Sequence, residues 1–433
     1  EALPSFEASL AMRQRVFPQD HPEVAATLIS LANCLDGLGR SEESLPKYEA
    51  ALAMQQRLSP GDDPVVADSL FKVAYCRQGL GHPEEALPLY QAAWQMEARL
   101  HPGDHANAAR DLYHLGRCAR ALGRMDDALA HHQAALQMRQ RLFGDHPDVV
   151  TSLNAVAQCQ TSLGRPDEAE PLLSQAVQIC RRIYTEPDGQ TALVLHHDAL
   201  ALWSLERLDE ALPLAREAAE MYRDHSNWSP HEEIHALGVL GGILFVKGEY
   251  AEATEGARRC LDVQRRLHPP GHVELGHTLA NLGLLLLRLD TLDAAREAEP
   301  LLRECLEIRS RTMPAAWQVD DTKSLLGGAL LAIADKDGAL LPAARVDELK
   351  QAEPLILEAY AGLKDNPNLP PVSRGAIDRT CETLVRIVRL YELWDELEPG
   401  SGYAGKAAEW RAKLESGGAG SAEPAPPARA SDQ

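Results

Sequence analysis

Apolar residues recur along this chain at the spacing of helices. On one predicted helix face they are separated by three or four positions, as in Ala86, Leu89, Tyr90, Ala93 and Met96. This spacing places all five side chains on the same side of an α-helix. The pattern therefore predicts an amphipathic helix here, and it returns many times along the sequence.

A short turn signal separates successive helices and repeats itself. It is clearest at Leu38-Gly39-Arg40, Leu80-Gly81-His82, Leu122-Gly123-Arg124 and Leu163-Gly164-Arg165, and it continues less regularly at Glu206, Gly248, Asp290 and Asp335. Successive turn positions are 42, 42, 41, 42, 42, 42 and 45 residues apart, and three extra residues within 292–298 explain the last value. Because Gly tolerates positive φ, each unit is predicted to be two antiparallel helices joined at this turn.

Small residues keep the same period at three further positions. Seven residues before each turn stand Ala32, Ala74, Gly116, Ala157, Ala199, Gly241, Gly283 and Gly328. Five residues after it stand Ser44, Ala86, Ala128, Ala169, Ala211 and Ala253, and twelve after it Ala51, Ala93, Ala135, Ala176, Ala218 and Cys260. The last two columns continue with Ala298, Cys305, Ala352 and Ala359. Small side chains let helix backbones approach closely, so these columns predict helix crossings.

The segments between units suggest how the helices begin and end. They read Asp20-His21-Pro22, Asp62-Asp63-Pro64 and Asp145-His146-Pro147. We expect the Asp to cap the next helix, whose first turn tolerates Pro. Basic residues such as Arg139 and Arg141 stand where the second helices end, which suits the helix dipole.

These columns resemble the small-residue pattern of tetratricopeptide repeats, and the 42-residue period with its Asp-His-Pro linker is similar to the kinesin-light-chain variety. The resemblance covers about residues 1–363 and implies an all-α fold, a right-handed α-solenoid of stacked antiparallel helix pairs (a TPR superhelix). Residues 1–22 would be the second helix of a truncated first repeat with its linker, so we expect further sequence upstream. Residues 23–363 would hold eight units, with insertions near 292–298 and 338–350.

The C-terminal stretch departs from the repeat. Residues 370–415 are expected to form a capping helix pair, because Ile377, Cys381, Leu384, Val388 and Tyr391 share one helix face and a second helix follows at 406–414. This tract is also similar to the end of tetratricopeptide arms of bacterial multidomain Ser/Thr kinases. Residues 416–433 are rich in Gly, Ala, Pro and Ser and are expected to be disordered.

Charge and composition narrow the choice of partners. The 433 residues carry 43 Lys and Arg against 64 Asp and Glu, a net charge of −21. Nucleic acids and anionic membranes both require a basic face, so we expect neither. The longest apolar run, 236–246, is too short to cross a bilayer, and the first residues lack a signal-peptide pattern. We therefore expect a cytoplasmic protein.

Three patterns that resemble chemical sites have simpler explanations. His231-Glu232-Glu233-Ile234-His235 satisfies the H-E-x-x-H zinc motif, but it falls at the start of a repeat helix. The glycines of 400–405, followed by Lys406, lack the preceding strand of a phosphate loop, so a link between helices is favoured. Four cysteines share one column, at positions too far apart for a zinc site or a disulfide: Cys34, Cys76, Cys118 and Cys159. We expect no catalytic residue, cofactor or metal.

The resemblance implies a concave face lined by the first helix of each unit. Its groove positions are read from their distance to the turn, and the candidates are Asp68, Tyr75, Arg110, Tyr113, Arg117, Arg120, Asn154, Gln158, His196, Trp203, His235 and His277. Three arginines beside two tyrosines favour an acidic or C-terminal peptide with an apolar anchor. The alternative for these arginines is a solvated face that pairs with the acidic residues nearby.

The sequence therefore predicts a non-enzymatic scaffold that binds a protein or peptide, and an acidic peptide is one candidate partner. One alternative keeps the fold but makes the chain the regulatory arm of a larger bacterial Ser/Thr kinase. A remote alternative is a zinc hydrolase that uses His231, Glu232 and His235. The sequence does not reveal the oligomeric state.

Overall fold

The computed structural model describes residues 2–224, 229–369 and 378–417. These residues form nineteen α-helices and no strand, in agreement with the predicted all-α class. The chain divides into two compact units, residues 1–207 and 208–433. Of the tail predicted to be disordered, positions 416 and 417 end the last helix, and 418–433 lie outside the described residues, as does Ile377.

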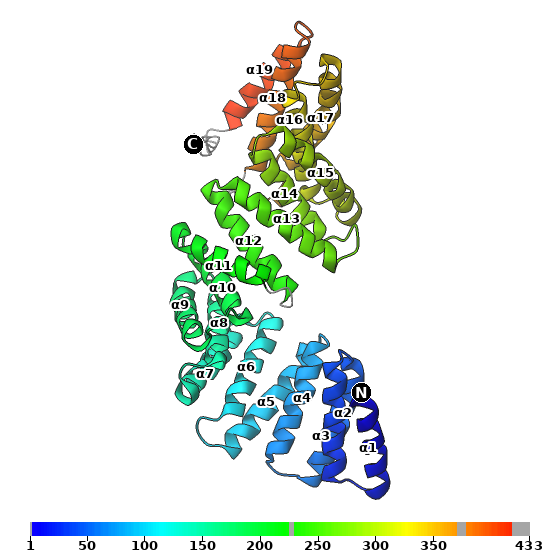
Figure 1. Cartoon of the computed structure of the whole chain (residues 1–433), viewed down its shortest axis with the longest axis vertical. Coiled ribbons are helices and arrows are strands. Elements are labelled where there is room, and N and C mark those ends of the chain that lie inside the picture. Colours follow the sequence, from blue (N-terminus) through cyan, green and yellow to red (C-terminus); the bar gives the residue numbers. More distant parts are fainter. Residues whose placement is uncertain (1, 225–228, 370–377, 418–433) are drawn as a thin grey trace. The chain divides into compact units, whose positions relative to one another are not determined.

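The first unit is a stack of ten helices in which each helix packs against the one before it and the one after it (Figure 1). They are α1 (Ala2–Val16), α2 (Pro22–Gly37), α3 (Ser41–Leu58), α4 (Pro64–Gly79), α5 (Pro83–Leu100), α6 (Ala106–Ala121), α7 (Met125–Phe143), α8 (Pro147–Ser162), α9 (Pro166–Ile183) and α10 (Gly189–Ser204). Short connections make successive helices antiparallel, as the turn signal predicts.

The second unit repeats this arrangement. Its helices are α11 (Leu208–Asp224), α12 (Pro230–Lys247), α13 (Tyr250–Leu267), α14 (Leu275–Arg288), α15 (Leu292–Thr312), α16 (Trp317–Lys336), α17 (Pro342–Leu363), α18 (Arg379–Leu397) and α19 (Tyr403–Gly417). The two longest are α17, with 22 residues, and α15, with 21, compared with 18 in α13. Added residues near 292–298 and 338–350 therefore accompany longer helices.

The turn positions adopt the left-handed backbone that the sequence predicts, with one exception. Gly39, Gly81, Gly123, Gly164 and Gly248 have φ between 73° and 84°. Glu206 and Asp290 take the same region without a glycine, at 59° and 54°. Asp335 does not, because α16 continues to Lys336, so the turn predicted there is wrong.

The small-residue columns are buried as predicted except at Gly241, which is half-buried and where an added Cβ would meet no atom within 4 Å. Relative exposure is 0% at Ala86, Ala128, Ala169, Ala93, Ala135, Ala176, Cys305 and Ala359, among others. One member of the first-helix column is wrong, because the structure places Gly327 rather than Gly328 against Ile356. Thr322 bonds to Arg309 as Ser152 bonds to Arg139, which shows that the register of α16 starts one residue earlier than constant spacing predicts.

We expect Ala135→Leu and Ala176→Leu each to lower the free energy of unfolding by about 1–3 kcal/mol, because both side chains are fully buried between helices and extra methylenes would overpack the crossing. Chemical denaturation measures the effect. Ala134→Leu is the matched control, since Ala134 is the exposed neighbour on α7 and its replacement should change stability by less than about 0.5 kcal/mol. Equal stability of all three variants would contradict the assigned crossing.

The linkers cap the helices in a way that differs partly from the prediction. The side chain directly before the helix accepts a backbone N–H, and in the Asp-His-Pro linkers this residue is His21 or His146, not the Asp. The preceding Asp instead pairs with an Arg 37 residues later, in the pairs Asp20–Arg57, Asp62–Arg99, Asp104–Arg141 and Asp145–Arg182. Because these pairs are partly exposed, each adds little stability.

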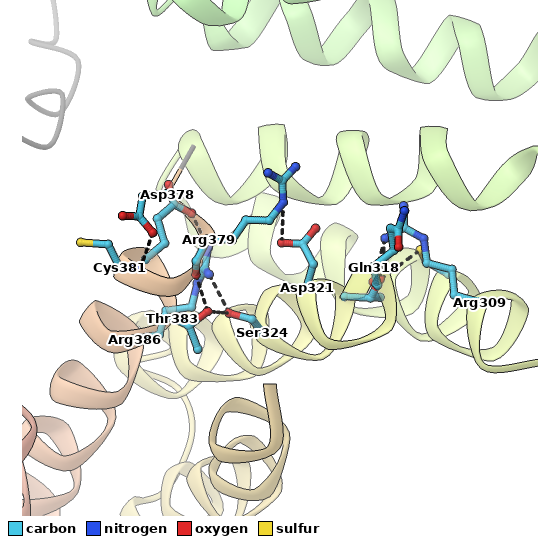
Figure 2. Close-up of polar contacts among 12 residues, drawn as sticks. Arg309, Gln318, Asp321, Ser324, Asp378, Arg379, Cys381, Thr383 and Arg386 are labelled. Carbon is cyan, nitrogen blue, oxygen red and sulfur yellow. Dashed lines mark hydrogen bonds and ion pairs between the residues drawn. The ribbon is translucent and has the colours of Figure 1, made fainter. Parts of the chain in front are cut away.

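The predicted C-terminal pair, α18 and α19, packs onto the end of the second unit. Figure 2 shows its polar contacts with α16: Arg379 lies 3.3 Å from Asp321, and the hydroxyls of Thr383 and Ser324 are 2.8 Å apart. Apolar side chains of α18, including Ile387 and Trp394, join a core with residues of α16 and α17. Residues 398–402 link α18 to α19, so the first part of the glycine-rich segment joins two helices as predicted, whereas Gly405 and Lys406 lie within α19.

The cysteines are free throughout the described part of the chain. Cys76, Cys118 and Cys159 are buried, as expected of small apolar side chains, and Cys34 is half-buried. Burial raises the pKa of the Cys118 thiol to about 11, so this group stays protonated and unreactive at neutral pH.

Candidate functional site

The first-helix surface of the first unit carries most of the predicted binding residues. We call the surface formed by α4, α6, α8 and α10 the first-helix face. It carries Asp68 and Tyr75 from α4, Arg110, Tyr113, Arg117 and Arg120 from α6, Asn154 and Gln158 from α8, and His196 and Trp203 from α10. The remaining two candidates, His235 on α12 and His277 on α14, belong to the second unit, where both are exposed.

Aromatic rings gather between α4 and α6. The ring of Phe71 lies 6.1 Å from that of Tyr75 and 4.9 Å, edge-on, from that of His114. Tyr113 also contacts His114, with centroids 5.4 Å apart. Tyr75 is 46% exposed, so it presents an accessible edge of this cluster. The sequence-based candidates omitted His114, although its place beside Tyr113 in the sequence could have drawn attention to it.

The three arginines of α6 differ in what they already bind. The Arg110 guanidinium lies 3.7 Å above the Phe71 ring and pairs with Asp68 and Asp111 at 3.2 and 3.0 Å. Its charge is therefore balanced within the protein. Arg117 is exposed and forms no hydrogen bond or ion pair with any residue that the structure describes. Arg120 is also exposed, and among the described residues it donates only to the neutral amide oxygen of Gln158, at 2.9 Å.

The pKa values of buried groups nearby show how these charges act. Burial, together with the nearby charges of Arg117 and Arg110, lowers the pKa of His114 to about 3. Burial also lowers the pKa of His132 to about 3, and Arg120 contributes next. Both imidazoles are therefore neutral at physiological pH. Burial raises the pKa of Asp111 to about 7, although Arg110 opposes this shift.

The α8 and α10 part of the first-helix face is polar. His197 Nδ1 lies 2.8 Å from Asn154 Oδ1, and the Gln158 amide nitrogen lies 3.4 Å from the same ring. The structure buries His196, the residue that helix spacing selected, at 3% exposure. His197 thus takes the position beside Asn154 and Gln158, and Trp203 is half-buried near the end of α10.

The H-E-x-x-H segment forms the first turns of α12. His231 and His235 are exposed, and the carboxylate of Glu233 pairs with Arg259. Within the described ranges, one group of three metal-capable donor atoms lies close together, and it does not include these histidines. The zinc-hydrolase alternative thus finds no third protein ligand in this part of the chain.

Comparison with known protein families decides the assignment. Models described as "Tetratricopeptide repeat" match residues 1–57, 65–141, 104–182, 161–224 and 234–274. The chain belongs to the tetratricopeptide repeat family. Tetratricopeptide repeat proteins are in general non-enzymatic scaffolds, and membership of the family makes this chain a protein-interaction scaffold.

Several solved structures have partial similarity to the chain. TPR-like repeats attributed to a kinesin light chain of Podosopora anserina are 20% identical, over 48% of this chain and 100% of that chain, with a TM-score of 0.43. BtubC (BKLC) from P. vanneervenii is 20% identical over 53% and 94%, with a TM-score of 0.47. PilF of Pseudomonas aeruginosa is 16% identical over 57% and 92%, with a TM-score of 0.39.

In a comparison with curated proteins, none matches this tetratricopeptide chain. Among the described helices, none combines the length and apolar character needed to cross a bilayer. The cytoplasmic location and the kinase arm stay predictions.

Proposed function

We propose that the first-helix face docks an acidic peptide that carries an apolar anchor, and that the chain works by docking alone, without catalysis or a cofactor. The observation that carries this proposal is the state of Arg117 and Arg120. Both are exposed and neither has a carboxylate partner among the described residues, in a protein whose net charge is −21. Two available cations in so acidic a chain favour an anionic ligand.

The chemistry of α6 and α4 suits such a ligand. A guanidinium binds a carboxylate through charge-assisted hydrogen bonds, which are about twice as strong as neutral ones. Tyr75 lies in the same turn-relative position of α4 as Arg117 in α6, so the two side chains stand in one column of the first-helix face. An apolar residue of the peptide would pack against Tyr75 while its acidic neighbours contact the arginines.

Arg110 has a supporting part in this proposal. Its guanidinium pairs with Asp68 and Asp111 and lies over the Phe71 ring. Arg110 therefore holds the Phe71 ring in place, and Tyr75 stacks against that ring. A surface held in place before binding loses less side-chain freedom when the ligand arrives. The peptide would therefore meet a preformed aromatic and cationic surface.

Affinity capture from source-cell lysate, quantified by mass spectrometry, tests the proposal with one charge-reversal variant and one matched control. Arg117→Glu should lose at least about 90% of the partner, because one charged hydrogen bond contributes about 1.5–3 kcal/mol, or roughly 10–100-fold in affinity. Arg266→Glu introduces the same charge change at an exposed α13 residue that has no ion pair in the described structure. It should keep the partner. Equal capture by both variants would contradict the proposed face.

A further inference from the structure

The start of α6 departs from a pattern that four other repeats of the first unit keep. Four residues that directly precede a first helix each accept a backbone N–H with their side chain: His21, Asp63, His146 and Asp188. His105 holds the same place before α6 and has the same extended backbone, at φ −142°, but its side chain makes no capping hydrogen bond. Its ring nitrogen Nδ1 instead lies near the carboxylate of Glu97.

The Glu97 carboxylate lies near the end of α5. His105 Nδ1 lies 3.4 Å from Glu97 Oε2, and His101 Nε2 lies 3.7 Å from the same oxygen. These separations exceed the usual 2.7–3.2 Å of a hydrogen bond. Glu97 is fully buried, and both its Oε2 and His105 Nδ1 are buried without a hydrogen-bond partner. Three polar side chains thus converge without bonding one another.

The charge at this position is reversed relative to other repeats. The place of Glu97 is taken elsewhere by Arg13, Arg139 and Arg309, each of which donates to a carbonyl and a hydroxyl of the next helix. Here the Arg is replaced by Glu97, and the hydroxyl position is occupied by the buried Asp111. Burying a carboxylate with one oxygen unpaired is costly, so a cation beside Glu97 Oε2 would stabilise this site.

The arrangement of donors fits a divalent metal. Zinc lies about 2.0–2.1 Å from histidine nitrogen and carboxylate oxygen, so neighbouring donors of a tetrahedral site are roughly 3.3 Å apart. The donor atoms of Glu97, His101 and His105 all lie within 4.8 Å of one another. The second oxygen of Glu97 accepts a hydrogen bond from Asn107 Nδ2 at 3.0 Å, which orients the carboxylate as outer partners of metal ligands do.

We propose that Glu97, His101 and His105 form a binding site for a divalent transition metal of the Zn²⁺ type. The metal would tie the end of α5 to the start of α6, with water in the fourth position because both imidazoles are partly exposed. This differs from the sequence-based expectation of no metal site. The spacing Glu97-x₃-His101-x₃-His105 crosses the end of a helix, so no helical pattern identifies it.

The second unit offers a natural control. Gln264, His268 and His272 hold the positions of Glu97, His101 and His105 one after another. The two rings stack as those of His101 and His105 do, with centroids 4.3 Å apart compared with 3.9 Å. His272 Nδ1, however, accepts the Glu274 N–H at 3.3 Å, and the carboxylate is replaced by an amide. This histidine pair should not hold a metal.

Calorimetric titration of chelator-treated full chain with ZnCl₂ tests the proposal. Wild type and the His268→Ala/His272→Ala variant should bind one equivalent and gain thermal stability with Zn²⁺. Glu97→Gln should weaken binding by at least the roughly 10–100-fold cost of losing an outer-shell partner. Gln occupies this column at Gln55 and Gln264, so the variant is expected to fold, and circular dichroism confirms it.

Co²⁺ substitution gives an independent reading of the same site. The visible absorption of wild type and of the His268→Ala/His272→Ala variant should show tetrahedral Co²⁺, and that of Glu97→Gln should not. Absence of saturable binding to wild type, unchanged affinity in Glu97→Gln, or loss of binding in the His268→Ala/His272→Ala variant would each overturn the proposal.

Discussion

Leu302→Ala is expected to lower the free energy of unfolding by about 2–5 kcal/mol, and Gly283→Ala should add less to that loss than it costs by itself. Leu302 is fully buried in α15 and packs directly against Gly283 of α14. A Cβ atom added at Gly283 would lie 2.5 Å from Leu302 Cδ2 and 2.7 Å from Cγ. The two positions therefore compete for the same space at one helix crossing.

Chemical denaturation of the single and double variants measures this coupling. Gly283→Ala alone should cost about 1–3 kcal/mol, because Leu302 has nowhere to move. In the double variant the new methyl group fills space left by Leu302, so the total loss should be at least ~1 kcal/mol smaller than the sum. Gly241→Ala in α12 is the control, since its Cβ meets no atom within 4 Å, and it should be neutral or stabilising by up to ~1 kcal/mol. Additive losses would disprove the assigned crossing.

His132→Leu is expected to stabilise the chain by about 1–2 kcal/mol at pH 7.5, and by more at lower pH. His132 is fully buried in α7, and both of its ring nitrogens lack a hydrogen-bond partner. Such unmet polar groups cost roughly 1–3 kcal/mol. The same position of the repeat carries Leu173 in α9 and Leu302 in α15, and Leu302 packs on a glycine as His132 packs on Gly116. Leucine therefore fits this site.

The pH dependence follows from the lowered pKa of His132. Burial holds the folded-state pKa near 3, while the unfolded chain takes up a proton near pH 6.5. As pH falls below 6.5, His132 binds a proton in the unfolded state but stays neutral in the folded state. Wild type therefore loses stability through this group, and the Leu variant does not. The difference in unfolding free energy between His132→Leu and wild type should therefore increase by up to ~1.4 kcal/mol per pH unit towards pH 4.5.

Denaturation curves of wild type and His132→Leu at pH 7.5, 6 and 5 measure this difference. The reverse exchange, Leu173→His, should destabilise the chain, and increasingly so as the pH falls. A constant difference between wild type and His132→Leu across this range would show that His132 is protonated in the folded state.

The sequence alone could predict the helices of this protein and how successive helices pack, because both follow from its repeats. The turn glycines, the buried alanine columns and the C-terminal helix pair all follow from residue size and spacing. These features depend on backbone approach, which a small residue permits wherever it recurs. A one-residue change before α16 was enough to move the crossing from Gly328 to Gly327.

The details of the candidate site depend instead on which side chains meet. Arg110 pairs with Asp68, 42 residues away, so its charge is balanced within the protein. Arg117 carries the same charge but has no ion-pair partner in the described structure, and the sequence does not distinguish the two arginines. Helix spacing places His196 in the column of Asn154, and both side chains are buried; it could not show that the neighbouring His197 contacts Asn154. The Glu97 cluster arises where one repeat exchanges an Arg for a Glu.

Selection of peptides from a random display library on the full chain tests the central claim most directly. The account predicts enrichment of peptides that carry Asp or Glu beside an aromatic or apolar residue, with binding that weakens as salt rises. Arg117→Glu should abolish this enrichment, and Arg266→Glu should leave it unchanged. Enrichment of neutral or basic peptides, or of the same acidic peptides on Arg117→Glu, would contradict the proposed docking of an acidic peptide on the first-helix face.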